Sequence, residues 1–140
     1  FGEKMLARKK GAIILMTSMA GLQGCGYLAV YAATKAFLRI LSESLWYEWK
    51  KRGVDIIGCC AGATSTPGYL KSDPVPAGFF APGVLTPGKV VKECFRKLGM
   101  RPSFITGRGN RLASFIMYRI LPRKMAVNIM GNTILKMYRL

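Results

Sequence analysis

Apolar runs of strand length flank one long amphipathic stretch in the first half of the chain. Residues 12–16 and 54–60 are short apolar runs of the kind that form buried strands. Residues 29–51 lie between them and predict a helix that ends before Gly53, a frequent helix stop. The apolar stripe of this helix is formed by Phe37, Leu41 and Leu45, and it is widened by Leu38, Trp46, Tyr47 and Trp49. Strand, helix and strand in this order predict an α/β fold.

Proline and glycine interrupt the middle of the chain. Residues 67–87 hold five of the seven prolines, and a loop of this length in a compact domain is usually functional or disordered. Thr86 followed by Pro87 predicts the start of a helix that runs to about Leu98, because threonine caps a helix and proline fits its first position. Residues 103–107 predict a short last strand.

The final part of the chain predicts two helices. Residues 111–121 are apolar on most sides and stop at Pro122. Residues 123–140 carry a polar stripe of Lys124, Asn128, Asn132, Lys136 and Arg139 opposite the apolar residues Ala126, Ile129, Met130, Ile134 and Met137. Such a helix can lie on a membrane, cap a hydrophobic substrate cavity or pack on an N-terminal half of the protein that the sequence lacks. The chain therefore divides into an α/β part, residues 1–110, and a basic helical extension, residues 111–140.

The net charge of +16 comes from 22 basic and six acidic residues, and all six acids precede residue 94. This charge suggests an anionic partner such as a membrane surface or nucleic acid, or else a soluble enzyme with a basic surface. We favour the enzyme, leave a peripheral membrane contact open and expect no nucleic acid. Residues 11–34 are uncharged and long enough to span a membrane. Four glycines, Thr17, Ser18 and Gln23 divide them instead into a strand, a loop and a helix start.

The four cysteines show no metal-ligand spacing, and the chain has no histidine to join them. We expect reduced structural thiols in a reducing compartment and no bound metal. The cysteines are Cys25, Cys59, Cys60 and Cys94.

Ser18, Tyr31 and Lys35 are the candidate catalytic residues. On one helix, Tyr31 and Lys35 are four residues apart and share a face. A free phenol has a pKa of about 10. A cation at about 4 Å contributes roughly 4 kcal/mol at an effective dielectric constant of about 20, which is enough to bring such a phenol toward neutrality. A phenol tuned in this way is suited to general acid–base catalysis.

The order of these residues resembles the short-chain dehydrogenase/reductase family. Ser18, twelve further residues and then Tyr31-x-x-x-Lys35 match the active-site pattern of that family. Residues 17–21 resemble its Ser-Ser-x-x-Gly strand end. Residues 61–67 resemble its Pro-Gly-x-x-x-Thr nicotinamide loop, with alanine in place of the proline.

Two motifs of the family have no counterpart in the chain. They are the glycine-rich phosphate loop and the Asn-Asn-Ala-Gly motif, and no asparagine precedes Asn110. The resemblance therefore implies the C-terminal half of a Rossmann-type, doubly wound parallel sheet, followed by a C-terminal helical extension. In this interpretation the chain carries the catalytic and substrate side of the site and lacks the adenine side. The extension is similar to that of the hydroxysteroid and long-chain 3-ketoacyl reductase branch.

The resemblance implies an oxidoreductase that interconverts an alcohol and a carbonyl with NAD or NADP, with NADP slightly favoured. Tyr31 would donate the proton and Ser18 would orient the reacting oxygen. Lys35 would tune Tyr31 and hold the ribose of the nicotinamide. The expected cofactor contacts are Tyr31, Lys35, Gly62, Thr64 and Thr66.

The resemblance also implies partners. Residues 67–87 match the substrate-binding lid of the family, and their apolar content favours a hydrophobic substrate. The helix from Tyr31 to Lys51 often forms the dimer interface in the family, which implies a homo-oligomer. The expected location is cytoplasmic. The rival interpretation is a non-catalytic fragment or pseudoenzyme that acts as a basic membrane-surface module. It explains the charge but not the combination of Ser18, Tyr31 and Lys35 with the threonine loop.

Overall fold

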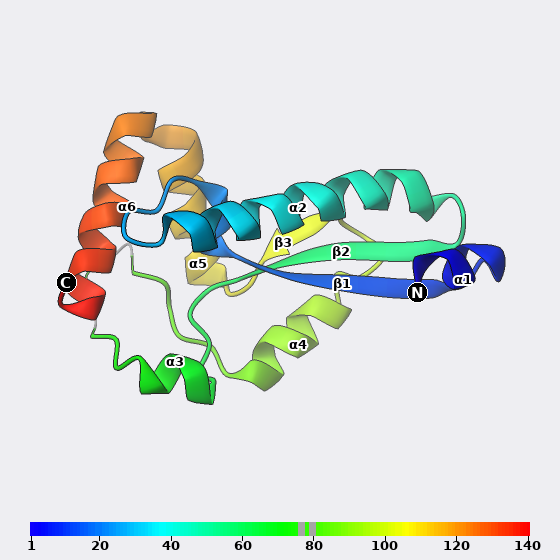
Figure 1. Cartoon of the computed structure of the whole chain (residues 1–140), viewed down its shortest axis with the longest axis horizontal. Helices are drawn as coiled ribbons and strands as arrows, with labels where there is room; N and C mark the ends of the chain where they lie inside the picture. The colour runs from blue at the N-terminus through cyan, green and yellow to red at the C-terminus, as the bar shows by residue number, and fades with distance from the viewer. Residues whose placement is uncertain (76–77, 79–80) are drawn as a thin grey trace.

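The computed structural model describes residues 1–75, 78 and 81–140, and a parallel sheet forms its centre (Figure 1). The strands lie in the order β1, β2, β3, and β1 pairs with β2 over its whole length. Their bounds are Gly11–Ser18 for β1, Val54–Ala61 for β2 and Ser103–Ile105 for β3. This arrangement confirms the predicted α/β fold with part of a Rossmann-like parallel sheet.

Helices surround this sheet. The first is α1 (Gly2–Ala7), and α2 (Ala29–Lys50) connects β1 to β2 after the 3₁₀ turn η1 (Met19–Leu22). The segment between β2 and β3 contains α3 (Pro67–Lys71) and α4 (Pro87–Phe95). After β3 come α5 (Arg108–Phe115), the π-helical turn η2 (Ile116–Ile120) and α6 (Arg123–Tyr138).

Strand β2 is covered on both faces. Helix α2 runs along one side of the strands and α4 along the other (Figure 1). Ser42 of α2 packs against Gly58, whereas Ile57 and Cys59 pack with Val90 of α4. A strand that is buried on both faces has a continuous apolar sequence. The continuous apolar run at residues 54–60 is therefore explained by the central position of β2 in the sheet.

The carboxyl ends of β1 and β2 point toward α5 and α6, and α1 lies at the opposite end of the sheet (Figure 1). The uncharged residues 11–34 form β1, η1 and the start of α2, as predicted. Within the described ranges, no helix has both the length and the apolar character needed to cross a membrane.

Several predicted boundaries were wrong. The loop predicted at residues 67–87 contains α3, which Thr66 caps by accepting a hydrogen bond from the backbone N–H of Tyr69. Thr66 and Pro67 form the same threonine–proline helix start that predicted α4. Helix α4 ends at Phe95, before the predicted end, and α5 begins before residue 111. Helix α1 was not predicted. Phe79 and Phe80, which contributed to the lid interpretation, lie outside the described residues.

Candidate active site

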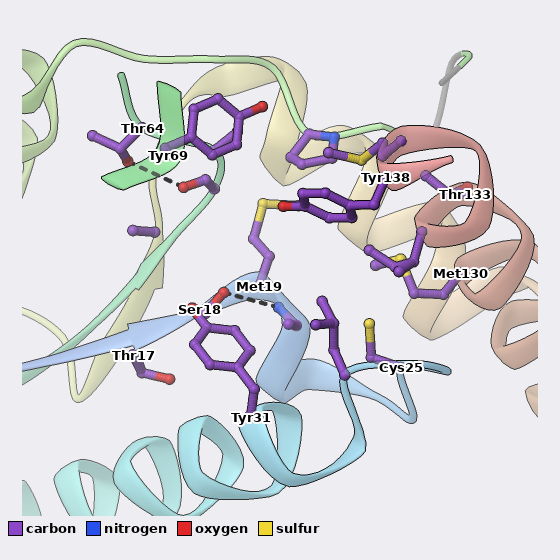
Figure 2. A pocket seen from close by; sticks show the side chains of 18 of the residues that line it. Thr17, Ser18, Met19, Cys25, Tyr31, Thr64, Tyr69, Met130, Thr133 and Tyr138 are labelled. Carbon is purple, nitrogen blue, oxygen red and sulfur yellow. Dashed lines mark hydrogen bonds between the residues drawn. The ribbon is translucent and has the colours of Figure 1, made fainter. Parts of the chain in front are cut away.

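A cavity of about 430 Å³ lies at the carboxyl ends of β1 and β2 (Figure 2). Ligands of open parallel sheets bind at this edge, where the strand-to-helix loops converge. The cavity is lined by Thr17, Ser18, Met19, Ala20, Cys25, Leu28, Tyr31, Ala61, Gly62, Ala63, Thr64, Thr66, Tyr69, Pro82, Met130, Thr133, Ile134, Met137 and Tyr138.

Ser18 is the last residue of β1 and is held in place by both of its neighbouring elements. Its backbone pairs in register with Ala61 at the end of β2. Its hydroxyl oxygen accepts a hydrogen bond of 3.2 Å from the backbone N–H of Ala20 in η1. A serine hydroxyl can accept and donate at the same time. Its proton therefore remains available for a group in the cavity.

Tyr31 and Lys35 lie one turn apart on α2, as the sequence predicted. Tyr31 lines the cavity beside Ser18 (Figure 2). Lys35 lies behind the phenol ring, with its Nζ 5.6 Å from the ring centroid. The same ammonium donates a hydrogen bond of 3.0 Å to the carbonyl of Met16. Ser18 and Tyr31 thus meet at the cavity, and Lys35 approaches Tyr31 from outside it.

The turn after Ser18 packs directly on α2 at Gly21. A Cβ on Gly21 would lie 2.6 Å from the backbone nitrogen of Ala36 and from the carbonyl carbon of Lys35. Thr17 adds a second link, because its hydroxyl donates a hydrogen bond of 2.6 Å to the carbonyl of Lys35. These contacts fix the distance between the Ser18 turn and the Tyr31 helix.

Replacing Gly21 with alanine is expected to destabilise the protein by about 1–3 kcal/mol, because the added methyl group overlaps backbone that cannot move away easily. Thermal unfolding measures this loss. Gly24→Ala is the matched control, since its Cβ would lie 3.4 Å from Val127 Cγ2, an ordinary contact. Equal stability of the two variants would contradict this packing.

The loop after β2 brings Gly62, Thr64 and Thr66, the residues predicted to contact the cofactor, to the cavity. The backbone N–H of Gly62 donates to the hydroxyl of buried Thr106 at 3.2 Å. A side chain at position 62 would have to displace the amide of Asn110. The hydroxyl of Thr64 donates to the carbonyl of Gly62 at 3.1 Å. The loop is therefore tied to the segment that follows β3.

Asn110 supports the site in a way that the sequence did not predict. Its buried side chain accepts a hydrogen bond of 2.8 Å from the N–H of Gly83 and donates one of 3.3 Å to the carbonyl of the same residue. It also packs beside Gly62. No sequence pattern signals this role, because Asn110 and Gly83 are far apart in the chain.

Helix α6 forms one wall of the cavity, with Met130, Thr133, Ile134, Met137 and Tyr138. Ile134 and Met137 are buried and pack with Cys25 and Ala32. Of the three roles left open for this helix, the structure shows the capping of an apolar cavity. These two side chains are not exposed for insertion into a bilayer.

All four cysteines are buried thiols without disulfides. Burial raises the pKa of Cys25, the cysteine that lines the cavity, and raises the pKa of Cys60 to about 11. The thiols are therefore protonated and poorly nucleophilic at neutral pH. In the ranges that the structure describes, no group of histidine, cysteine, aspartate or glutamate could hold a metal ion.

Comparison with known proteins shows the family of the chain. Residues 1–73 match the family model of short chain dehydrogenases. The 7beta-hydroxysteroid dehydrogenase of Clostridium sardiniense is 34% identical over 104 residues, which are 74% of this chain and 40% of that protein. The 7beta-hydroxysteroid dehydrogenase of Collinsella aerofaciens is 36% identical over 109 residues, which are 75% of this chain and 41% of that protein.

A solved structure from a study of 7beta-hydroxysteroid dehydrogenase stereoselectivity has the same fold. It aligns with a TM-score of 0.81 at 28% identity, over 92% of this chain and 51% of that chain. The chain spans about 40% of the length of the curated relatives named above.

Proposed function

Because the chain belongs to the short-chain dehydrogenase family, we propose that the protein interconverts an alcohol and a carbonyl with NAD or NADP. The observation that carries this proposal is the meeting of Ser18 and Tyr31 in one cavity, with the ammonium of Lys35 behind the phenol ring. Incubation of the purified native protein with NADH or NADPH and apolar ketones tests it. Oxidation of the cofactor with formation of the alcohol is the expected result.

The donor groups at this edge of the sheet fit the nicotinamide end of the cofactor. The ammonium of Lys35 uses one of its three donors on Met16 and keeps two for the ribose. The hydroxyl of Thr66 accepts from Tyr69 and keeps its own proton for the carboxamide. Among the described residues, the backbone N–H of Thr64 has no acceptor and is available for the same group. When bound, the cofactor supplies or takes the hydride.

The chain's own residues position the reacting oxygen and move its proton. Ser18 donates a hydrogen bond to the carbonyl oxygen and orients it. Tyr31 gives its phenolic proton to this oxygen as negative charge develops there. The ammonium of Lys35 stabilises the charge that Tyr31 then carries. In the oxidative direction the same proton returns to Tyr31.

We propose that the substrate is an apolar alcohol or ketone of the hydroxysteroid type. None of the described residues that line the cavity is charged, and three methionines, three alanines, Leu28 and Ile134 supply apolar wall. Burial of a charged substrate group in such a cavity would lack compensation. The names of the two bacterial relatives support the same class.

Helix α2 presents an exposed apolar stripe that fits the proposed homo-oligomer. Its most exposed members lie at helical spacing and are Val30, Phe37, Ile40 and Tyr47. Exposed apolar stripes of this kind mark interaction surfaces. We propose that two copies of the protein pair through it.

Replacing both Phe37 and Ile40 with glutamate is expected to shift the protein from dimer to monomer, because the paired helices would bury four like charges. Light scattering coupled to size-exclusion chromatography measures the change. Arg52→Glu, an exposed substitution beyond the end of α2, should leave the dimer intact. A wild-type monomer would refute the proposed pairing.

The alternative of a non-catalytic membrane-surface module has less support. This alternative needs the apolar side of α6 to contact a membrane. Ile134 and Met137, which belong to that side, are buried in the protein instead. Binding to anionic vesicles that is lost on deleting residues 123–140 would favour it.

A further inference from the structure

The cavity is uncharged in a chain that carries a net charge of +16. Its polar side chains are mostly hydroxyls. Those of Thr17, Thr64 and Thr133 donate to backbone carbonyls, and Ser18, Tyr31 and Thr66 have roles in the proposed reaction and cofactor contact. The two remaining hydroxyls, those of Tyr69 and Tyr138, need a separate explanation.

Tyr69 and Tyr138 come from different elements, α3 and α6, and both line the cavity. Figure 2 shows them on the side of the cavity opposite Tyr31. Within the described part of the chain, neither phenol hydroxyl makes a hydrogen bond. Burial, together with the nearby phenol of Tyr138, raises the pKa of Tyr69. The phenol of Tyr69 is therefore neutral at physiological pH, and a phenol hydroxyl can both donate and accept a hydrogen bond.

Two links hold the elements that carry these tyrosines. The backbone N–H of Val75 donates a hydrogen bond of 3.0 Å to the carbonyl of Met137, next to Tyr138. Arg139 forms an ion pair of 3.4 Å with Asp73. Both Asp73 and Arg139 have positive φ angles of 44° and 55°, which are unfavourable for residues other than glycine. The chain thus accepts local strain where the segment after α3 meets the end of α6.

Three methionines line the cavity, namely Met19, Met130 and Met137. The side chain of Met19 extends from the Ser18 turn toward Tyr138 (Figure 2). Methionine side chains are flexible and polarisable and adapt to apolar ligands of different shapes. A molecule that reaches from Tyr31 to the two tyrosines passes Met19, and an apolar middle suits that contact.

We propose that Tyr69 and Tyr138 form a second polar site, which binds an uncharged oxygen group of the substrate remote from the reacting carbon. This inference rests on the proposed function and specifies its substrate class. The substrate is an elongated apolar ketone or alcohol with a second hydroxyl or carbonyl at its far end. A carboxylate does not fit this site, because none of the described residues that line the cavity is cationic. The two tyrosines are specificity-determining residues and take no part in proton transfer.

The test compares two steroids that differ in one group: a 7-ketosteroid with a hydroxyl at position 3 and its 3-deoxy analogue. The variants are Tyr69→Phe and Tyr138→Phe, which remove only the hydroxyls. Each is expected to lower kcat/KM for the 3-hydroxy steroid by about three- to tenfold, mainly through KM, because one hydrogen bond is lost. Turnover of the 3-deoxy analogue should not change. Tyr27→Phe is the matched control, because Tyr27 is exposed and lies outside the cavity.

Calorimetric binding of the same two steroids separates this inference from the proposed function. If the wild-type protein reduces neither these steroids nor a panel of other apolar ketones, the proposed function fails, and the tyrosine site is judged by binding alone. Weaker binding of only the 3-hydroxy steroid by both tyrosine variants supports the site. Equal loss for both steroids, or no loss for either, overturns it.

Discussion

Replacing Tyr31 with phenylalanine is expected to lower kcat by about 10²–10⁴-fold and to leave the fold intact, because the change removes only the positioned proton donor. Tyr31 is 46% exposed and lines the cavity, so no buried hydrogen bond is lost with its hydroxyl. Steady-state kinetics with a ketone substrate measures the loss, and circular dichroism checks the fold.

Tyr27→Phe serves as the control for this variant. Tyr27 precedes α2 and does not line the cavity, so its kcat should equal that of the wild type. A Tyr31→Phe protein that retains kcat within about twofold, less than the loss of a general acid allows, would remove Tyr31 from the mechanism.

Replacing Lys35 with methionine should slow the reaction by about a hundredfold. At the observed 5.6 Å between Nζ and the Tyr31 ring centroid, the interaction of a unit charge is worth about 3 kcal/mol at an effective dielectric constant of about 20. That energy corresponds to about a hundredfold in rate. Methionine keeps the length of the side chain and removes the charge.

Circular dichroism distinguishes loss of the charge from a packing defect, because Lys35→Met should slow the reaction with the fold intact. Lys51→Met removes an exposed cation at the end of α2 and should not change the rate. A Lys35→Met protein with wild-type kinetics would contradict the proposed use of this ammonium.

Local sequence patterns predicted the elements that carry Ser18, Tyr31 and Lys35. A continuous apolar run identified β2, because a central parallel strand has no polar face. Spacing of three and four residues identified α2 and placed Tyr31 and Lys35 on one face. The structure brings Ser18 and Tyr31 to one cavity through tertiary contacts that local patterns do not specify. The main one is the close approach of Gly21 to the backbone of α2.

Contacts between distant residues could not be predicted. Asn110 accepts a hydrogen bond from the backbone N–H of Gly83, 27 residues away in the chain. Thr106 accepts one from the backbone N–H of Gly62, 44 residues away. Such pairs leave no periodic signal, because they depend on how the strand ends come together. The amphipathic pattern of residues 123–140 predicted a helix but not what its apolar side covers. Its packing against Cys25 and Ala32 is a property of the folded chain.

Hydride transfer to a ketone tests the central claim most directly. NADH or NADPH carrying deuterium at the transferred position is incubated with the purified native protein and a 7-ketosteroid, and mass spectrometry follows the product. The account predicts one deuterium on the carbinol carbon of the alcohol, and labelled alcohol that forms about 10²–10⁴-fold more slowly when Tyr31→Phe replaces the wild type. Absence of labelled alcohol from folded wild-type protein, with both cofactors and a panel of apolar ketones, would contradict it.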